Sequence, residues 1–299
     1  MISIVVLTYN RIELLKGCLN SLFFQDFPKD EFEIIVIDDG STDNTSFVVK
    51  NFNVRYFYQK HSGVSVARNN GFRRAKGGII CFVADDYVLP KNYLKYVDKF
   101  FKTKKQANVV RFLLENVDKS SLIARMNHYY LESSLRMTID KYSNQRIKGF
   151  IQSYNLPASG AAAFRKKVFR QVGIFNENLI FGEDSDFGFR LAKKNIYINL
   201  STKVKIGQHN EEGFVQSCMK RFRYALYKCV FEKINPDFSN LSSNKTKNLI
   251  YHLVSLVVNP IKRCKFIISK QDNIILIFFF MFIFNFFHTL GFLYSFIKK

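Results

Sequence analysis

Acidic residues are scarce in this chain. In 299 residues, 24 Asp and Glu stand against 45 Lys and Arg, which gives a formal net charge of +21. This excess of positive charge indicates an anionic partner: nucleic acid, an anionic membrane face or a phosphorylated substrate. Charged residues of both signs make up only 23% of the chain and hydrophobic residues 47%, which excludes a disordered or fibrous protein. The length suits one large domain with an appendage, or two modest domains.

Cysteine is also rare, and tryptophan is absent. The cysteines are odd in number and lack tight spacing: Cys18, Cys81, Cys218, Cys229 and Cys264. This pattern argues against a disulfide scaffold and against a zinc cluster, and it fits a reducing cytoplasm. The first residues lack a basic leader followed by an apolar run and a cleavage site, so we expect no signal peptide.

One long segment near the C-terminal end lacks any formal charge. Residues 274–297 are long enough to cross a hydrocarbon core of about 30 Å as a helix. Asn285, His288 and Thr289 lie in its middle, and a buried core helix is the alternative interpretation. Because a helix that is apolar on all sides is hard to bury in a domain of this size, we expect a transmembrane or re-entrant membrane helix.

Basic residues gather before this apolar segment. From residue 191 onward there are 17 Lys and Arg against 5 Asp and Glu. Residues 249–269 are typical of a basic interfacial segment at anionic headgroups. Because the Lys and Arg excess is heavier before the span than after it, we expect the bulk of the protein to be cytoplasmic, with a C-terminal membrane anchor. A single span would place Lys298 on the far side, and a hairpin turning near Asn285 would keep it inside.

Strand patterns alternate with helix patterns over the first hundred residues. Apolar runs predict buried strands, and apolar residues at helical spacing predict helices between them. The predicted strands are 2–8, 32–37, 54–58 and 78–83, and the predicted helices are 12–24, 43–51 and 65–75. This alternation predicts an α/β fold with a parallel sheet and helices on both faces. Ligands of such sheets bind beyond the carboxyl ends of the strands.

Polar clusters follow three of these strands directly. They are Thr8-Tyr9-Asn10, Asp38-Asp39 and Asp85-Asp86. Each cluster alone is equally well explained as a turn or helix cap. Three of them at one edge of one sheet indicate a binding site instead. Adjacent carboxylates need an opposing charge, and Mg²⁺ or Mn²⁺ suits carboxylate and phosphate oxygens.

Four segments together resemble glycosyltransferase family 2. They are Val5–Arg11 (VVLTYNR), Ile34–Asp43 (IIVIDDGSTD), Gly63–Gly71 (GVSVARNNG) and Phe181–Leu191 (FGEDSDFGFRL). They cover residues 1 to about 210 in the order and spacing of that family. The resemblance implies a GT-A fold, with a mostly parallel sheet flanked by helices and a Rossmann-like nucleotide-binding half. It also implies inverting transfer from a nucleotide-activated sugar, with Mn²⁺ or Mg²⁺ on the diphosphate.

The resemblance assigns a nucleotide-sugar site to eight residues: Thr8, Tyr9, Asn10, Arg11, Asp38, Asp39, Arg68 and Asp86. Asp39 would accept a hydrogen bond from the base, and Arg68 would support the nucleotide side. Asp85 falls on the metal-binding carboxylate of the Asp-x-Asp motif, and Val83 replaces the first acid. His209 is a second candidate ligand for metal or phosphate, although a lone His is as often structural.

The resemblance places the chemistry on Glu183 and Asp184. Asp184 would be the general base that takes the proton of the acceptor hydroxyl. Glu183 would position the acceptor or the base, and the metal would offset charge on the departing diphosphate. The alternative is that these acids, with Asp186, decorate a helix N-terminus, where acids are favoured. Asp186 and Arg190 have the i,i+4 spacing of a helical ion pair.

The acceptor side is less distinct in the sequence. We expect a catalytic domain over 1–210 in which 115–154 is a variable acceptor-side insertion. Residues 157–165 are mostly small, and the family places such a stretch beneath the acceptor. Ordinary tight packing explains it equally well. We expect a basic amphipathic helical segment over 211–270, before the membrane helix at 274–297.

These features predict a membrane-attached inverting glycosyltransferase. Its donor would be a UDP-, GDP- or dTDP-linked sugar, and its acceptor a lipid-linked saccharide or a cell-surface polysaccharide. Membrane lipid would be a further partner. The alternatives are a transferase to polyprenyl phosphate and, because of Val83, an inactive membrane-bound binding or scaffold protein. We expect no nucleic-acid partner, because the chain shows no recognition motif for one.

Overall fold

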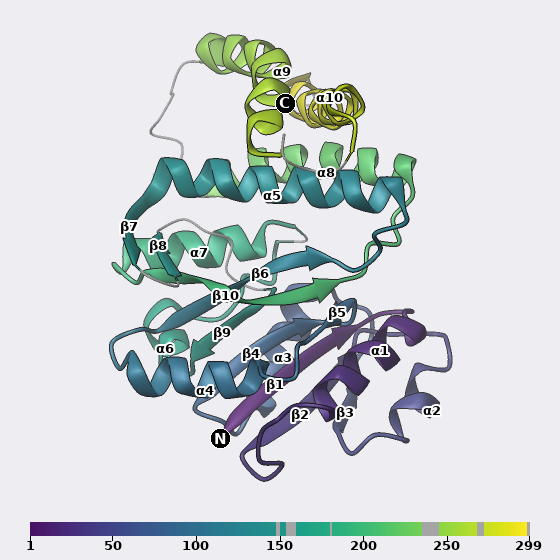
Figure 1. Cartoon of the computed structure of the whole chain (residues 1–299), viewed down its shortest axis with the longest axis vertical. Helices are drawn as coiled ribbons and strands as arrows, with labels where there is room; N and C mark the ends of the chain where they lie inside the picture. The colour runs from purple at the N-terminus through teal and green to yellow at the C-terminus, as the bar shows by residue number, and fades with distance from the viewer. Residues whose placement is uncertain (148–149, 154–159, 180, 235–244, 268–271, 298–299) are drawn as a thin grey trace. The chain divides into compact units, whose positions relative to one another are not determined.

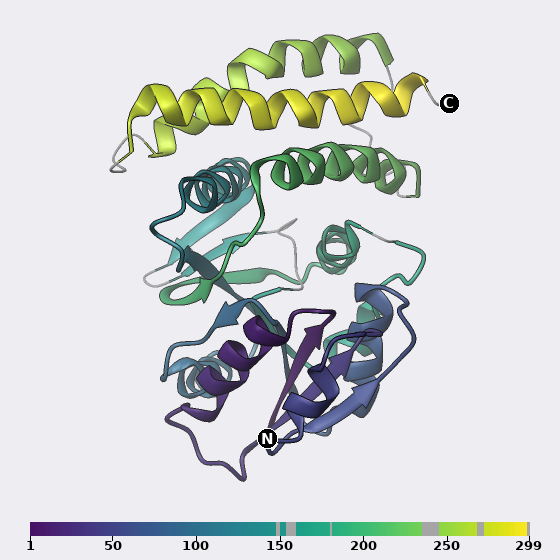
Figure 2. The ribbon, with the colours of Figure 1, turned by 90° about the vertical axis from the view of Figure 1, so that its right-hand side faces the viewer.

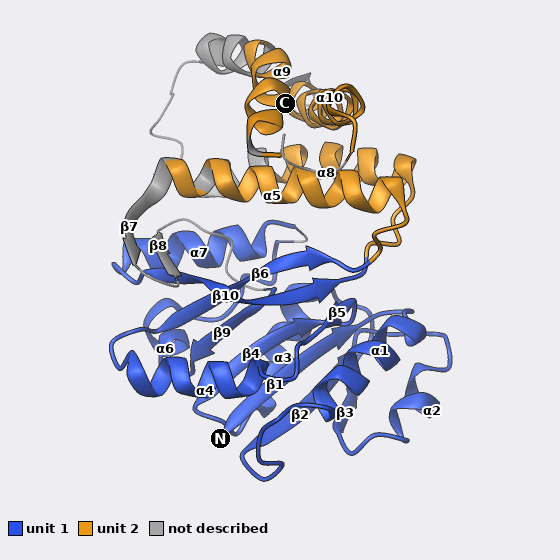
Figure 3. Cartoon of the chain, viewed as in Figure 1, with its two compact units in different colours: residues 1–117, 142–209 blue, residues 118–141, 210–299 orange. Residues whose placement is uncertain are grey.

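The computed structural model describes residues 1–147, 150–153, 160–179, 181–234, 245–267 and 272–297 (Figure 1). The chain divides into two compact units (Figure 3). The first contains residues 1–117 and 142–209, and the second contains residues 118–141 and 210–299. Part of the predicted 115–154 insertion therefore groups with the C-terminal helices. Residues 157–159 of the small-residue stretch lie outside the described residues.

Within the described residues, the first unit is built on one ten-stranded sheet. Its strands are β1 (Ile2–Thr8), β2 (Phe32–Asp38), β3 (Arg55–Tyr58), β4 (Ile79–Ala84), β5 (Tyr87–Val88), β6 (Val109–Asn116), β7 (Ser143–Ile147), β8 (Phe150–Ser153), β9 (Ala162–Arg165) and β10 (Ile198–Gln208). The order is β3-β2-β1-β4-β9-β6-β10-β8-β7, and β5 pairs with the end of β10.

The predicted parallel core of this sheet is confirmed. Strands β3, β2, β1 and β4 are mutually parallel, and β6 is parallel to β10. The sheet is nevertheless mixed, because β9 inserts antiparallel between β4 and β6. Strand β9 is the described part of the small-residue stretch. Its alanines are fully buried, so this stretch is a central strand of the sheet.

Six helices flank the sheet among the described residues of the first unit. They are α1 (Ile12–Phe23), α2 (Thr45–Val49), α3 (Val64–Arg74), α4 (Tyr93–Thr103), α6 (Val168–Val172) and α7 (Glu183–Lys193). Leucines of α1 and α4 bury themselves against one face of the sheet, together with Ile4, Val6 and Val83. Val83 is 1% exposed. Val83, at the position where the family has an acid, is thus a core residue whose side chain packs beneath α1 and α4.

Aromatic side chains fill the opposite face of the sheet. Phe175 stacks on Phe187 of α7 at 4.6 Å between ring centroids, and Phe82 and Phe164 contact the same group edge-on. Such ring pairs contribute beyond their buried area. Helix α3 also packs on this face, where Gly71 lies against Val5.

We expect Gly71→Ala to destabilise the first unit by about 1–3 kcal/mol, because the new methyl group overpacks the core. A Cβ at Gly71 would lie 2.2 Å from Cγ1 of Val5. Gly17→Ala in α1 is the matched control, since a Cβ there meets nothing within 4 Å. It should instead stabilise by about 0.5–1 kcal/mol through helix propensity. Urea unfolding of both variants measures the change in the free energy of unfolding, which should have opposite signs. Equal changes would contradict the packing of α3.

The second unit is helical. Its helices are α5 (Leu122–Tyr142), α8 (Phe214–Ile234), α9 (Lys245–Ile267) and α10 (Ile274–Ile297). Figure 2 shows α10 running beside α8 and α9, and it packs against both. Arg125 on α5 forms an ion pair of 2.9 Å with Asp272, which also accepts a hydrogen bond from Tyr129. The hydrogen bond from Arg125 holds the pKa of Asp272 below its usual value and ties α5 to the start of α10.

Helix α10 has the bounds that the sequence predicts for the apolar segment. Among the described residues it is the one helix long and apolar enough to cross a membrane, a test that core helices of soluble proteins also pass. Its polar residues Asn285 and Thr289 are buried inside the unit. Asn285 donates a 2.8 Å hydrogen bond to the carbonyl of Ser255 in α9. The polar interruptions therefore mark the face that packs on neighbouring helices.

Candidate active site

The ends of β1 and β4 meet at the carboxyl edge of the sheet. Thr8 at the end of β1 donates a 2.9 Å hydrogen bond to Oδ2 of Asp85, which follows β4. Arg11 lies 3.5 Å from the other carboxylate oxygen of Asp85. Thr8 and Asp85 are buried, whereas Arg11 is half exposed. The parallel register thus brings together two of the three predicted polar clusters.

Asp39, after β2, is the anchor of a second loop. Its carboxylate accepts hydrogen bonds from Gln59 Nε2 at 2.7 Å and from the amides of Ser62 and Gly63 at 2.9 Å. The ring of His61 lies 3.0 Å from Oδ2. Asp39 therefore ties the end of β2 to the segment that leads into α3.

Asp38 and Asn10 hold the neighbouring loops. Asp38 accepts hydrogen bonds from the Ser41 amide at 2.7 Å and from the Tyr56 hydroxyl at 2.6 Å. Asn10 adopts a positive φ of 52° and accepts a 2.7 Å hydrogen bond from the Thr42 amide. Asp38 and Asn10 thus stabilise the turns that follow β2 and β1, as the turn interpretation of these clusters expects.

An aromatic pair lies next to Asp39. The rings of Tyr9 and His61 stack at 4.2 Å between centroids, and both side chains are largely exposed. A flat exposed pair of this kind beside a carboxylate is suited to a nucleobase. Sequence reasoning missed His61. Its signal is weak, a single His two residues before the Gly63–Gly71 motif, and only folding places it against Tyr9.

The structure brings His209 to the Asp85-Asp86 turn. The end of β10 pairs antiparallel with β5, so the His209 amide donates a 2.9 Å hydrogen bond to the carbonyl of Asp86. Gln208 donates a further hydrogen bond of 3.0 Å to the Asp86 carboxylate. Burial raises the pKa of Asp85 to about 6, although Arg11 opposes this shift.

The donors at this turn fit part of a cation site. Carboxylate oxygens and an imidazole nitrogen are ligands that divalent transition metals accept. In the part of the chain that the structure describes, no three His, Cys, Asp or Glu side chains cluster as a complete metal site. Asp85 and His209 would therefore hold a cation jointly with oxygens from a bound diphosphate. The buried charge of Asp85 favours such a cation.

Glu183 and Asp184 begin α7, and the structure separates their environments. Arg68 of α3 forms a buried 2.5 Å ion pair with Glu183 and lies over the Phe175 ring at 5.3 Å. Burial raises the pKa of Glu183, the charge of Asp184 raises it further, and Arg68 opposes both. Asp184 is only partly buried and accepts hydrogen bonds from Ser185. Of the two acids, Asp184 is the one left accessible to a substrate.

The same helix carries the predicted i,i+4 pair. Arg190 forms a 2.7 Å ion pair with Asp186 and donates to the carbonyl of Val172. Asp186 thus has a cationic partner within its own helix, whereas among the described residues Asp184 forms hydrogen bonds only with Ser185. This difference separates the acid that stabilises the helix from the acid that faces the site.

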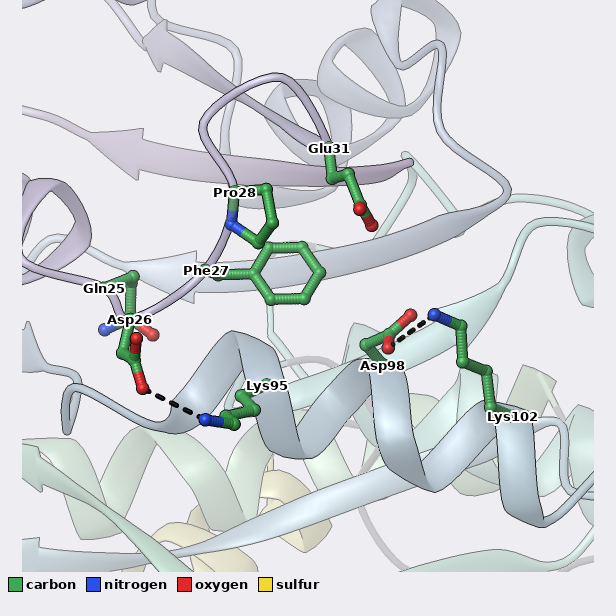
Figure 4. Close-up of a pocket in the computed structure, with 8 residues that line it drawn as sticks. All are labelled: Gln25, Asp26, Phe27, Pro28, Glu31, Lys95, Asp98 and Lys102. Atoms are coloured by element: carbon green, nitrogen blue, oxygen red, sulfur yellow. Dashed lines mark hydrogen bonds and ion pairs between the residues drawn. The ribbon is translucent and has the colours of Figure 1, made fainter.

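A separate pocket lies between the α1–β2 connection and α4 (Figure 4). Its volume is about 530 Å³, and its lining contains none of the predicted site residues. Asp26 pairs with Lys95 at 3.2 Å and Asp98 with Lys102 at 2.9 Å. Two of its three carboxylates are thus paired with lysines at its rim, and Glu31 is the third.

Known proteins resemble the chain in sequence. The family described as glycosyl transferase family 2 matches residues 3–173. Glycosyltransferase AglE of Haloferax volcanii is 25% identical over 228 residues, which are 74% of this chain and 71% of AglE. Three further curated relatives are matched over only 30% to 34% of their own length.

Two solved structures share the fold. Staphylococcus aureus TarS 1–349 in complex with UDP-GlcNAc has a TM-score of 0.56 at 18% identity, covering 100% of this chain and 92% of that one. The mannosyltransferase PcManGT of Pyrobaculum calidifontis, with GDP-Man and Mn²⁺, has a TM-score of 0.63 at 15% identity, covering 100% and 87%. The fold class expected from the sequence is thereby confirmed. The chain belongs to glycosyl transferase family 2 and is a glycosyltransferase of the GT-A fold.

Proposed function

We propose that the protein transfers a sugar, with inversion, from a nucleoside diphosphate sugar to a hydroxyl of a saccharide acceptor, and that Asp184 is the general base. The observation that carries this proposal is the different environment of the two acids at the start of α7. Arg68 neutralises Glu183, while Asp184 stays partly exposed and has no cationic partner at contact distance among the described residues. A carboxylate that must take a proton needs this accessibility.

The reaction follows from these placements. The acceptor hydroxyl attacks the anomeric carbon as Asp184 takes its proton, and the bond from that carbon to the diphosphate oxygen breaks. Glu183, fixed by Arg68, orients the start of α7 and so positions Asp184. Inversion results because attack and departure occur on opposite sides of the sugar.

The donor would bind along the carboxyl edge of the sheet. Tyr9, stacked on His61, would supply a face for the base. Asp39 would accept from an N–H group of the base in exchange for the hydrogen bond that Gln59 now donates. The residues assigned to the rest of the donor site lie at the strand ends, in the loops after them and on α3: Thr8, Asn10, Arg11, Asp38, Arg68 and Asp86. Asp85 and His209 would hold Mn²⁺ or Mg²⁺, which when bound neutralises the charge of the departing diphosphate. The Mn²⁺ named with the mannosyltransferase of the same fold supports this assignment.

The acceptor proposal is a lipid-linked saccharide or a cell-surface polysaccharide. One relative is named poly(ribitol-phosphate) beta-N-acetylglucosaminyltransferase TarS, and it is 38% identical over 99 residues, 31% of this chain.

The second unit supports membrane attachment. Val254, Val257 and Ile261 on α9 are each more than half exposed at i, i+3 and i+7. Phe279 on α10 adds to the exposed apolar surface of these helices at 56%.

The packing of α10 against α8 favours a helix that lies in the membrane interface over one that crosses the membrane. Helix α10 packs against α8, and a Cβ at Gly291 of α10 would meet the carbonyl oxygen of Phe222 in α8. Lys220 and Arg223 belong to α8, and charged residues are costly at the bilayer centre. A helix packed against such a neighbour is better accommodated at the headgroup boundary, with its exposed apolar face towards the lipid.

A donor screen tests the proposed reaction. Purified full-length protein is mixed with UDP-, GDP- and dTDP-sugars and Mn²⁺ or Mg²⁺, and release of the nucleoside diphosphate is followed. We expect metal-dependent turnover of one donor that is lost in Asp85→Ala and kept in Asp98→Ala, a carboxylate of the separate pocket at α4. No turnover with any donor, despite measurable nucleotide binding, would favour a binding or scaffold protein.

Vesicle binding tests the membrane surface. Co-sedimentation with phosphatidylglycerol vesicles should exceed that with phosphatidylcholine vesicles, because the chain is basic. Phe279→Asp and Ile261→Asp should each weaken binding about tenfold or more, since each removes a large apolar contact with lipid. Phe47→Asp is the matched control, an equally drastic change at a Phe 69% exposed on α2. Equal loss in the control variant would contradict the assignment to α9 and α10.

A further inference from the structure

Arg111 is a cation within an apolar strand. Strand β6 begins Val109-Val110-Arg111-Phe112, and its other three residues here are fully buried. Among the described residues, no hydrogen bond or ion pair reaches the guanidinium of Arg111, and its Nε and Nη1 atoms are buried. Buried polar groups are almost always hydrogen-bonded, so an unpartnered guanidinium calls for a ligand.

The sheet register places Arg111 on the face that carries α7. In β6 and β9, Val109 pairs with Phe164 and Arg111 pairs with Ala162. Phe164 packs on Phe187 of α7 at 5.7 Å between ring centroids. Because side chains alternate along a strand, Arg111 points to the same face as Val109 and lies two residues nearer the carboxyl edge.

This position lies within electrostatic range of Asp184, the carboxylate that we propose as the base. Burial lowers the pKa of Arg111, and the charge of Asp184 is the largest opposing influence. The two groups therefore interact electrostatically, yet they do not form an ion pair. Tyr87 lies within reach of both, and the neighbour of Arg111 in β9 is only the methyl group of Ala162. Among the described residues, Arg111 and Asp184 therefore influence each other electrostatically without a direct hydrogen bond or ion pair between them.

We propose that Arg111 binds an oxyanion of the acceptor, a phosphate or carboxylate next to the hydroxyl that Asp184 deprotonates. This inference rests on the proposed function, because it takes Asp184 as the base. A guanidinium offers a planar fork of donors that matches either oxyanion. Its position on the face that carries α7, and the influence of the Asp184 charge, assign it to the acceptor side. An acceptor without an oxyanion would leave the buried N–H groups at Nε and Nη1 without a hydrogen-bond partner, which is costly.

The test compares matched acceptors in the presence of the donor found by the screen. The pairs are ribitol 5-phosphate with ribitol, and p-nitrophenyl glucuronide with p-nitrophenyl glucoside. They distinguish phosphate from carboxylate and each from its neutral analogue. In the wild type we expect a preference for one anionic member. In Arg111→Gln this preference in kcat/KM should fall about 10- to 100-fold, mainly through KM, because a charged hydrogen bond is lost.

Two further variants sharpen the result. Arg111→Lys keeps the charge and should retain part of the preference, and its thermal melting is compared with that of Arg111→Gln to exclude misfolding. Arg170→Gln, at an exposed arginine of α6, is the control that should change nothing. Inhibition of donor hydrolysis by the same compounds gives a second readout, in which anionic compounds should inhibit the wild type more than Arg111→Gln.

The outcomes separate the two proposals. If the wild type hydrolyses no donor, the proposed function itself fails. If it hydrolyses a donor but treats anionic and neutral compounds alike, the role of Arg111 is overturned and the proposed function stands. The role is also overturned if Arg111→Gln lowers both members of a pair equally with a shifted pH profile, because Arg111 would then act only on Asp184.

Discussion

Asp184→Asn is expected to lower the transfer rate roughly 100- to 10,000-fold, the range in which general bases contribute. The amide keeps the shape of the side chain but cannot take the acceptor proton. Because Asp184 makes hydrogen bonds only with the adjacent Ser185 among the described residues, the fold should tolerate the change. Single-turnover transfer with a fixed donor measures the rate, and the loss should appear in kcat with donor affinity retained.

Glu183→Gln is the informative comparison for this prediction. It keeps a polar side chain beside Arg68 but removes the ion pair, so it should lower activity less than Asp184→Asn does. Circular dichroism establishes that both variants are folded. Retained turnover in Asp184→Asn, or a larger loss in Glu183→Gln, would move the role of the base to Glu183.

Arg68→Met should destabilise the first unit by about 3–5 kcal/mol, because it leaves Glu183 buried without its counter-charge. Arg68 and Glu183 are 9% and 8% exposed, and their ion pair joins α3 to α7. The substitution also removes the guanidinium that lies over the Phe175 ring. Urea unfolding at neutral pH measures the loss.

The double variant Arg68→Met/Glu183→Met separates charge from packing. If the loss in Arg68→Met comes from the isolated carboxylate, removing that carboxylate should recover most of the stability. Arg73→Met is the matched control, since its ion pair with Glu177 is exposed and contributes at most about 1 kcal/mol. Additive effects of the two substitutions would show that Arg68 and Glu183 do not depend on each other.

The local elements of the first unit could be predicted because they depend on local patterns. The strand at 2–8 and the helices after it are found within a few residues of their predicted ends. Burial requires apolar residues at the period of each element, so the pattern is readable without knowledge of neighbours. The helix predicted over 43–51 is shorter in the structure and spans Thr45–Val49. Asp43 lies before it and accepts a hydrogen bond from the Thr45 amide.

Pairings between distant residues could not be predicted in this way. The last four residues of the small-residue stretch, Ala162–Arg165, form the antiparallel strand β9, and nothing in their composition specifies the direction of pairing. His209 meets the Asp85-Asp86 turn only because β10 pairs with β5. The roles assigned to Asp85, His209 and the other site residues from the family resemblance stay predictions that the experiments above test.

The sequence by itself determined the family, the alternation of strands and helices, and which polar groups lie at the carboxyl edge of the sheet. Each of these depends on residue type and spacing along the chain. Only the tertiary structure decided that Arg68 neutralises Glu183, that Asp184 remains accessible, and that Arg111 lies on the face that carries α7 without a hydrogen-bond partner for its guanidinium among the described residues. The physical reason is that burial and neighbouring charges set the pKa and the accessibility of a charged side chain. Residues far apart in sequence supply those neighbours only after folding.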